Sequence, residues 1–228
     1  RDRPSVLRYL ADEKIGIKFR RIVSVAEVLT PLDRATIERY FQTTVHQFYT
    51  STEGEIAATC EHGTLHLNEE IMVVEKEWID EERTMFHPII SDFKRKTQPM
   101  IRYRQNDILV LSKEPCPCGD ARQAIAEILG RQDDVFEFES TSGKKELVVP
   151  DLIRRATMGL HSGITAYMVE QVSPSNIVVQ LQPHLPNLDF SGFEQLWEAK
   201  EIVPPQISVE TYDFTPSATK MRRISKRF

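Results

Sequence analysis

The chain has 228 residues, enough for one large domain or two small ones. Hydrophobic residues make up 40% and charged residues 28%, which is typical of a soluble globular protein and excludes a disordered chain. The net charge of −5 argues against a general nucleic-acid-binding surface, and no apolar run approaches the roughly 20 residues that span a bilayer. Three cysteines, without a signal-peptide pattern, argue against a disulfide scaffold and predict a cytoplasmic protein.

The first part of the chain alternates predicted helices and strands. A helix is expected over residues 4–13, and a second starts at Thr30, because Thr30 is a good N-cap and Pro31 suits the first turn. Strands are expected on either side of this second helix, and the order strand, helix, strand favours a parallel α/β layer. The strands predicted in this part span residues 18–25, 44–49, 55–60, 64–67, 70–74, 100–104 and 107–111.

The pattern changes after Gly130. From Leu147 onward the predicted order is strand, helix, strand, strand, helix, strand, which is the order of the ferredoxin-like split βαβ fold. We therefore predict an α/β region over residues 1–131, followed by a small α+β, ferredoxin-like domain over residues 132–228. The strands expected in the second region span residues 135–139, 147–149, 166–171, 177–182 and 207–213, and its helices span 151–159 and 190–200.

Two polar stretches follow predicted strands and could bind a nucleotide. In Tyr49-Thr50-Ser51-Thr52-Glu53-Gly54, the Thr52 hydroxyl could bond a phosphate oxygen, Glu53 is a hard oxygen ligand for Mg²⁺, and Tyr49 offers a flat face for a base. In Tyr103-Arg104-Gln105-Asn106-Asp107, the carboxylate could accept hydrogen bonds from both ribose hydroxyls. Ordinary surface turns would explain either stretch taken alone.

Two further stretches have both a structural and a functional interpretation. Gly130-Arg131-Gln132-Asp133-Asp134 is either a solvated linker or a hinge for domain rotation. The C-terminal residues 219–227 hold five cations in an acidic chain. They predict a solvated basic tail, a weak nucleic-acid patch, or a lysine that is brought to a phosphate.

The order of these stretches, YxxTEG, YRxxD, GRxDD and a lysine ahead of two arginines, resembles the adenylate-forming superfamily of ligases. The residues of these motifs are most similar to those of the branch that contains phenylacetate–coenzyme A ligases and CapK-like synthetases. Three further segments resemble this branch, residues 60–68, 97–104 and 115–119. The resemblance therefore covers essentially the whole chain. The family's phosphate loop would lie upstream of residue 1, so we expect a C-terminal part of a ligase that does not turn over alone.

The resemblance implies a role for individual residues. On the nucleotide side, Ala26 and Glu27 would line the adenine, although their turn lacks the family's usual glycine, and Tyr49 would stack on the base. Thr52 would bind the α-phosphate, Glu53 would hold Mg²⁺, Asp107 would take the ribose hydroxyls, and Arg131 would lie near ribose and phosphates. Asp133 would be the hinge of the small domain, and Lys220 would bridge carboxylate and phosphate in the adenylation transition state.

The activity implied is ATP- and Mg²⁺-dependent activation of a carboxylate, expected to be aromatic, as an acyl-adenylate. The acyl group would then pass to coenzyme A, another thiol or a different acceptor, and the assembly could be a homodimer. A CapK-like variant would instead transfer AMP onto a cofactor hydroxyl. The competing interpretation is a non-catalytic, zinc-stapled module that binds a ligand or regulates a partner.

The three cysteines of the chain all fall in predicted loops or at strand ends. Soft sulfur and nitrogen ligands in sets of four suit Zn²⁺, and relatives with the GxH phrase carry these cysteines together. The expected ligands are Cys60, His66, Cys116 and Cys118, with His62 as the substitute for His66. Three buried free cysteines are the alternative.

Overall fold

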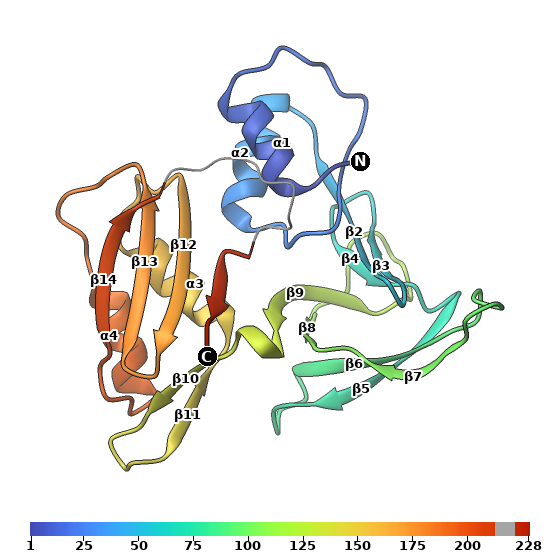
Figure 1. Cartoon of the computed structure of the whole chain (residues 1–228). Helices are drawn as coiled ribbons and strands as arrows, with labels where there is room; N and C mark the ends of the chain where they lie inside the picture. Colours follow the sequence, from blue (N-terminus) through green and yellow to red (C-terminus); the bar gives the residue numbers. More distant parts are fainter. Residues whose placement is uncertain (213–221) are drawn as a thin grey trace. The chain divides into compact units, whose positions relative to one another are not determined.

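The computed structural model describes residues 1–212 and 222–228, and the chain divides into two compact units (Figure 1). The first unit comprises residues 1–128, and the second comprises residues 129–212 with 222–228. Across these described residues, no helix combines the length and the apolar character that crossing a bilayer requires.

Two helices open the first unit, α1 (Pro4–Asp12) and α2 (Pro31–Phe41). Both begin with a proline, and the Thr30 hydroxyl accepts a hydrogen bond from the Asp33 backbone N–H at 3.1 Å, as expected of an N-cap. Because these start signals are local, the sequence predicts both helices to within a residue or two. The helices pack on the neighbouring strands through a buried cluster of Leu7, Ile22, Ile37 and Val45.

A nine-stranded sheet forms the remainder of the first unit. Its strands are β1 (Ile22–Ser24), β2 (Val45–Ser51), β3 (Gly54–Thr59), β4 (Leu65–Leu67), β5 (Met72–Trp78), β6 (Met85–Asp92), β7 (Met100–Arg104), β8 (Asp107–Leu111) and β9 (Ala124–Arg131). The order is β1-β2-β3-β4-β9-β8-β6-β5, with β7 paired to β6. The expected parallel layer is limited to β1 and β2, because the pairs from β2–β3 through β6–β8 whose register is defined run antiparallel.

The second unit holds a hairpin, a four-stranded sheet and two helices. The hairpin is β10 (Phe136–Glu139) with β11 (Lys145–Val148), and the sheet has the order β14-β13-β12-β15. Figure 1 shows α3 and α4 behind this sheet, and the rings of Phe138, Phe193 and Trp197 pack together in the core. The remaining elements are η1 (Gln132–Asp134), α3 (Pro150–Gly159), β12 (Ala166–Ser173), β13 (Asn176–Gln182), α4 (Ser191–Ala199), β14 (Gln206–Thr211) and β15 (Ile224–Lys226).

The sheet of the second unit differs from the ferredoxin-like arrangement that the element order predicts. In that fold the first strand joins the sheet, whereas here β11 pairs with β10, and β13 pairs directly with β14 in parallel. The short turn through Gly143 closes the β10–β11 hairpin, so the backbone groups of β11 find partners locally. The unit is therefore a mixed α/β fold with its own strand order.

The C-terminal residues after position 221 form a strand, which the interpretation as a basic tail did not predict. β15 pairs in parallel with β12 in the register Val169↔Ile224. Two of its cations are held by carboxylates of the same unit: Lys226 pairs with Glu137, and Arg227 pairs with Glu170. The solvated tail, one of the alternatives for this segment, therefore does not describe residues 224–226, which extend the sheet.

Gly130 has a backbone conformation that other residues rarely adopt, with φ of 116°. A Cβ atom there would lie 3.1 Å from Cγ of Pro150, the first residue of α3. We expect Gly130→Ala to destabilise the second unit by more than the about 1–2 kcal/mol that left-handed geometry costs a non-glycine residue, because the clash adds to it. Gly143→Ala is the matched control, since its φ is also positive at 75° but nothing lies within 4 Å of the added atom. The β12 and β13 amides should lose more protection against hydrogen exchange in Gly130→Ala than in Gly143→Ala. Equal losses of protection would contradict the prediction.

Candidate functional site

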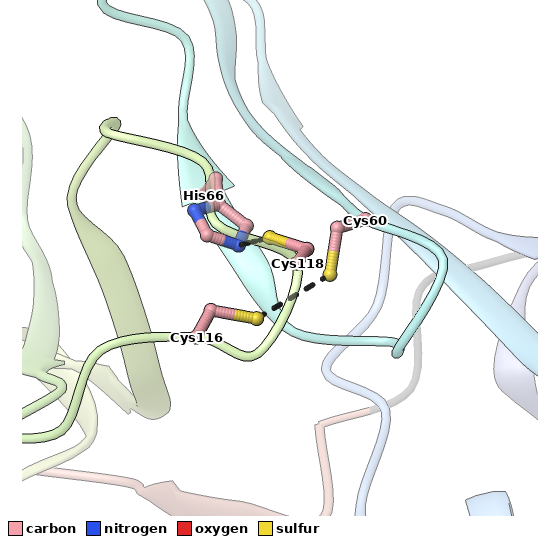
Figure 2. A group of neighbouring side chains, drawn as sticks. All are labelled: Cys60, His66, Cys116 and Cys118. Carbon is pink, nitrogen blue, oxygen red and sulfur yellow. Dashed lines mark hydrogen bonds between the residues drawn. The ribbon is translucent and has the colours of Figure 1, made fainter.

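The first unit brings three cysteines and a histidine together (Figure 2). Cys60 directly follows β3, His66 lies on β4, and Cys116 and Cys118 belong to the loop between β8 and β9. Their ligand atoms all lie within 4.8 Å of one another. This is the set of four that the sequence analysis selected, and His62, which is about half exposed beside Glu61, is not among them.

The cluster is arranged as a set of metal ligands would be. The Cys60 and Cys116 sulfurs are 3.7 Å apart, and the Cys118 sulfur lies 3.5 Å from His66 Nε2. On the other side of the ring, His66 Nδ1 lies 3.1 Å from the Arg122 carbonyl oxygen, to which it can donate only as Nδ1–H. That hydrogen bond leaves the Nε2 lone pair directed at the thiols, which is how histidine ligands are commonly oriented.

The local hydrogen bonds favour a thiolate at Cys116. Tight turns carry the ligands: the Cys60 backbone carbonyl accepts from the Gly63 N–H at 3.0 Å, and the Cys116 backbone carbonyl accepts from the Gly119 N–H at 3.1 Å. The pKa of the Cys116 thiol is lowered to about 6, chiefly by a hydrogen bond from the Thr64 hydroxyl and by the Cys118 backbone N–H. At Cys118 a hydrogen bond from the Asp120 backbone N–H lowers the pKa, but burial and the Cys116 and Cys60 sulfurs outweigh it and raise the pKa. Three sulfurs and one imidazole nitrogen match the donors that tetrahedral Zn²⁺ prefers.

The β2–β3 hairpin and the β7–β8 turn meet in a second polar cluster. The Tyr49 hydroxyl donates to Asp107 Oδ2 at 2.5 Å, although the two residues are 58 positions apart. The backbone carbonyl of Asp107 in turn lies 2.9 Å from Nδ1 of His87, which is buried on β6. Tyr49 is only 8% exposed, so its hydroxyl ties it to Asp107 while most of its ring is packed in the core.

Glu53 lies in the same cluster and is held by neutral donors. Gln105 Nε2 is 3.4 Å from Glu53 Oε2 and 3.4 Å from the Ser51 hydroxyl. Burial raises the pKa of the Glu53 carboxyl, but hydrogen bonds from Ser51, its own backbone N–H, Gln105 and Tyr103 outweigh burial and hold the pKa below its usual range. Glu53 is therefore an oriented anion at neutral pH.

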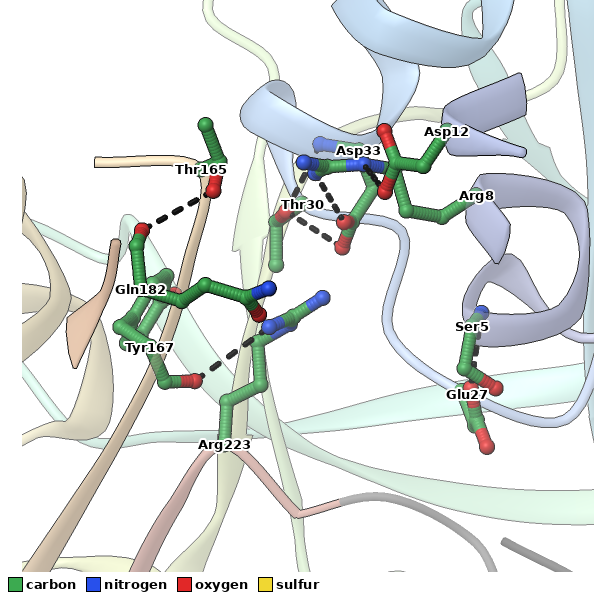
Figure 3. Close-up of polar contacts among 10 residues, drawn as sticks. All are labelled: Ser5, Arg8, Asp12, Glu27, Thr30, Asp33, Thr165, Tyr167, Gln182 and Arg223. Carbon is green, nitrogen blue, oxygen red and sulfur yellow. Dashed lines mark hydrogen bonds and ion pairs between the residues drawn. The ribbon is translucent and has the colours of Figure 1, made fainter. Parts of the chain in front are cut away.

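The turn after β1 contains Ala26 in a left-handed backbone conformation. Its φ is 70°, in the region where glycine is favoured. The neighbouring Ser24 hydroxyl is buried and has no hydrogen-bond partner within the described part of the chain, which is uncommon in folded proteins. Glu27 points to α1 and accepts from the Ser5 backbone N–H at 3.3 Å (Figure 3), so it satisfies a donor at the start of that helix.

The remaining predicted residues lie elsewhere. Thr52 is exposed in the β2–β3 turn. In the second unit, Arg131 ends β9, and Asp133 lies within η1. Lys220 lies outside the described residues.

Gln105 and His87 contribute to the second polar cluster but were not among the predicted site residues. Gln105 belongs to the YRxxD stretch, in which only the carboxylate of Asp107 was given a role. The position of Gln105 two residues before Asp107 is the feature from which a role for its amide could have been predicted. His87 carried no motif, since its partner is a backbone carbonyl that any residue could offer.

No family model matches the chain. Protein CapK of Staphylococcus aureus is 28% identical over 180 residues, a match that covers 77% of this chain and 39% of CapK. A crystal structure of 2-hydroxyisobutyryl-CoA ligase in the postadenylation state, in complex with R3-HIB-AMP, superposes with a TM-score of 0.72 and is 18% identical. That alignment covers 99% of this chain and 54% of the ligase. An anthranilate CoA ligase in complex with anthranoyl-AMP gives a TM-score of 0.61 at 12% identity, covering 98% of this chain and 47% of that ligase.

The chain thus spans about two fifths of CapK and about half of these ligases. At such low identities the solved structures show the fold and not the activity. The chain resembles the C-terminal part of the adenylate-forming ligases in its fold and CapK in its sequence, as its ordered motifs predict.

Proposed function

We propose that the chain is the C-terminal part of an ATP-dependent, AMP-forming ligase and carries the ribose and metal side of its nucleotide site. The observation that supports this most is the meeting of Tyr49, Glu53 and Asp107 from two hairpins far apart in the sequence. A solvated surface turn would not require a buried tyrosine and a buried glutamine to hold its two carboxylates. The orphan hydroxyl of Ser24 also supports a polar ligand at the turn after β1.

The carboxylates of this cluster suit the roles that the resemblance implies. A carboxylate has several acceptor sites, so Asp107 can accept from ribose hydroxyls in addition to the Tyr49 hydroxyl. Glu53 is ionised and offers hard oxygen atoms to Mg²⁺, while the exposed Thr52 hydroxyl can donate to a phosphate oxygen. Bound at Glu53, Mg²⁺ would neutralise phosphate charge during the attack of the substrate carboxylate.

The complete reaction is proposed for the whole protein. An oxygen of the substrate carboxylate, aromatic in our proposal, would attack the α-phosphorus of ATP with release of pyrophosphate. The acyl group of the resulting acyl-adenylate would then pass to coenzyme A or another acceptor with release of AMP. Lys220 would bridge the two anions as a compact cation, Arg131 would lie near the phosphates, and rotation about Asp133 would exchange the two half-reactions. The alternative is the variant in which AMP passes to a cofactor hydroxyl, and a cytoplasmic homodimer is the assembly we propose.

We also propose that Cys60, His66, Cys116 and Cys118 hold a structural Zn²⁺. Their convergence within 4.8 Å supports this, together with the Arg122 carbonyl that fixes the His66 tautomer. All four ligand positions are supplied by the protein, which is the pattern of a structural site and not of a catalytic one. The ion would tie the turn after β3 to the loop between β8 and β9, next to strands that carry the nucleotide cluster.

The nucleotide proposal predicts that AMP or ATP protects the chain against heat and that Asp107→Ala abolishes the protection. A ligand at 100 times its Kd adds about 2.7 kcal/mol to folding stability, which is easily seen as a rise in Tm. Glu82→Ala, which removes an exposed carboxylate outside the cluster, should leave the rise intact. A folded wild-type chain whose Tm does not respond to either nucleotide would favour the non-catalytic module instead.

A further inference from the structure

Gln105 is a buried amide in the turn between β7 and β8. Its side chain belongs to a residue that is 5% exposed, and its backbone N–H donates to the Pro88 carbonyl on β6 at 2.9 Å. The backbone hydrogen bond fixes the position of the Gln105 Cα, and burial leaves the side chain few alternative rotamers. The amide is therefore held in one position, unlike the amide of a mobile surface side chain.

The amide of Gln105 serves two residues of the other hairpin at once. Nε2 carries two hydrogens and lies 3.4 Å from both Ser51 Oγ and Glu53 Oε2. Ser51 Oγ also accepts from the Glu53 backbone N–H at 3.2 Å. Gln105, Ser51 and Glu53 thus form a closed set of contacts around a single carboxylate.

A neutral donor is what a cation-binding carboxylate needs as its partner. An arginine or lysine in the place of Gln105 would pair with Glu53 and compete with a metal ion, whereas an amide orients the carboxylate and leaves its charge available. The Tyr103 hydroxyl, at the end of β7, is a further side-chain donor to Glu53. The same turn ends at Asp107, so a single element positions both carboxylates of the cluster.

We propose that Gln105 is a positioning residue that orients Glu53 toward the divalent cation bound with ATP. This inference rests on the proposed function, because it assumes that Glu53 meets the metal of a bound nucleotide. It adds a residue whose side chain touches neither nucleotide nor metal and acts only through Glu53.

The test compares the affinity of the full chain for ATP with Mg²⁺ and for ATP with EDTA, by isothermal titration calorimetry. The Kd for ATP in EDTA divided by the Kd for ATP with Mg²⁺ measures how much the metal strengthens binding. We expect Gln105→Leu to reduce this ratio about tenfold, the lower end of what loss of such an orienting partner costs a metal site. The Kd for ATP in EDTA should stay within about twofold of the wild-type value, since a leucine of similar volume keeps the turn packed.

Two control variants separate positioning from general damage. Ile56→Val removes one methyl group from the core of the same unit and leaves every polar group of the cluster in place, and Gln123→Leu makes the same substitution at an exposed site; both should keep the wild-type ratio. A wild-type ratio in Gln105→Leu would overturn the role of Gln105 while leaving the nucleotide site in place. Equal wild-type affinities with and without Mg²⁺ would remove the metal role of Glu53, and no ATP binding at all would remove the proposed function. Either result would overturn the inference about Gln105 as well.

Discussion

Removing the metal from the Cys60, His66, Cys116 and Cys118 cluster should lower the Tm of the first unit markedly. These ligands join the turn after β3 to the long loop between β8 and β9, and without an ion three half-buried sulfur atoms would face one another. Structural Zn²⁺ contributes about 10–16 kcal/mol in isolated zinc-finger peptides. We expect a smaller effect here, because the unit also has an apolar core, but one that exceeds an ordinary point substitution.

The measurement is elemental analysis of protein purified without chelators, followed by thermal unfolding before and after chelation. The wild-type chain should carry close to one zinc, and Cys116→Ala should lose both the zinc and the sensitivity to chelation. His62→Ala is the matched control, because it removes a histidine of the same loop that lies outside the cluster. Far less than one zinc per chain, or a Tm that chelation leaves unchanged, would show that the cysteines are simply free thiols.

The ligand set could be predicted from the sequence because its residue types are scarce. The chain holds three cysteines, and each lies beside a turn signal, so few combinations were available. The sequence left His62 as a substitute for His66, and the fold brings His66 to the cysteines. What the sequence could not supply is the Arg122 carbonyl behind His66, because a backbone acceptor leaves no trace in residue identity.

The strands that the sequence missed depend on distant partners. β6 contains Pro88, which lacks a backbone N–H and argues against a central strand. In the fold, Pro88 lies where β6 changes neighbours: Met85 and Phe86 pair with β8, while Ile89 and Ile90 pair with β7. The missing donor therefore falls in a gap between two ladders, an arrangement that no local pattern reveals.

The helices and the sites show opposite limits of prediction. α2 was predicted because Thr30, Pro31 and Asp33 act within one turn of each other. Asp107 was predicted to bind the ribose hydroxyls. Its hydrogen bond to Tyr49 joins positions 58 apart, and the burial of the tyrosine ring is seen only in the folded unit. Local chemistry is readable from sequence, whereas the partner that each polar group finds is set by topology.

The second large effect is expected at Arg8, which carries a buried charge between α1 and α2 (Figure 3). Its side chain is 4% exposed and lies 3.2 Å from Asp33 Oδ1, and Asp33 is itself 1% exposed. Asp33 Oδ2 also accepts from the Thr30 hydroxyl at 2.7 Å, and Arg8 Nε donates to Asp12 at 2.8 Å. Arg8→Met keeps most of the apolar stem but leaves the Asp33 carboxylate buried beside an uncharged side chain.

Breaking one side of a buried ion pair costs about 3–5 kcal/mol, because the remaining charge stays desolvated. We therefore expect Arg8→Met to increase hydrogen exchange in α1 and α2 far more than Asp12→Ala, which removes only the exposed partner and should cost less than about 1 kcal/mol. Adding Asp33→Asn to Arg8→Met removes the stranded charge and should restore most of the protection, since a neutral replacement for a buried pair is often tolerated. If Arg8→Met behaved like Asp12→Ala, or if the second substitution brought no recovery, the cost could not come from an unpaired buried carboxylate. Packing of the Arg8 stem against the apolar cluster of the two helices would then be its main contribution.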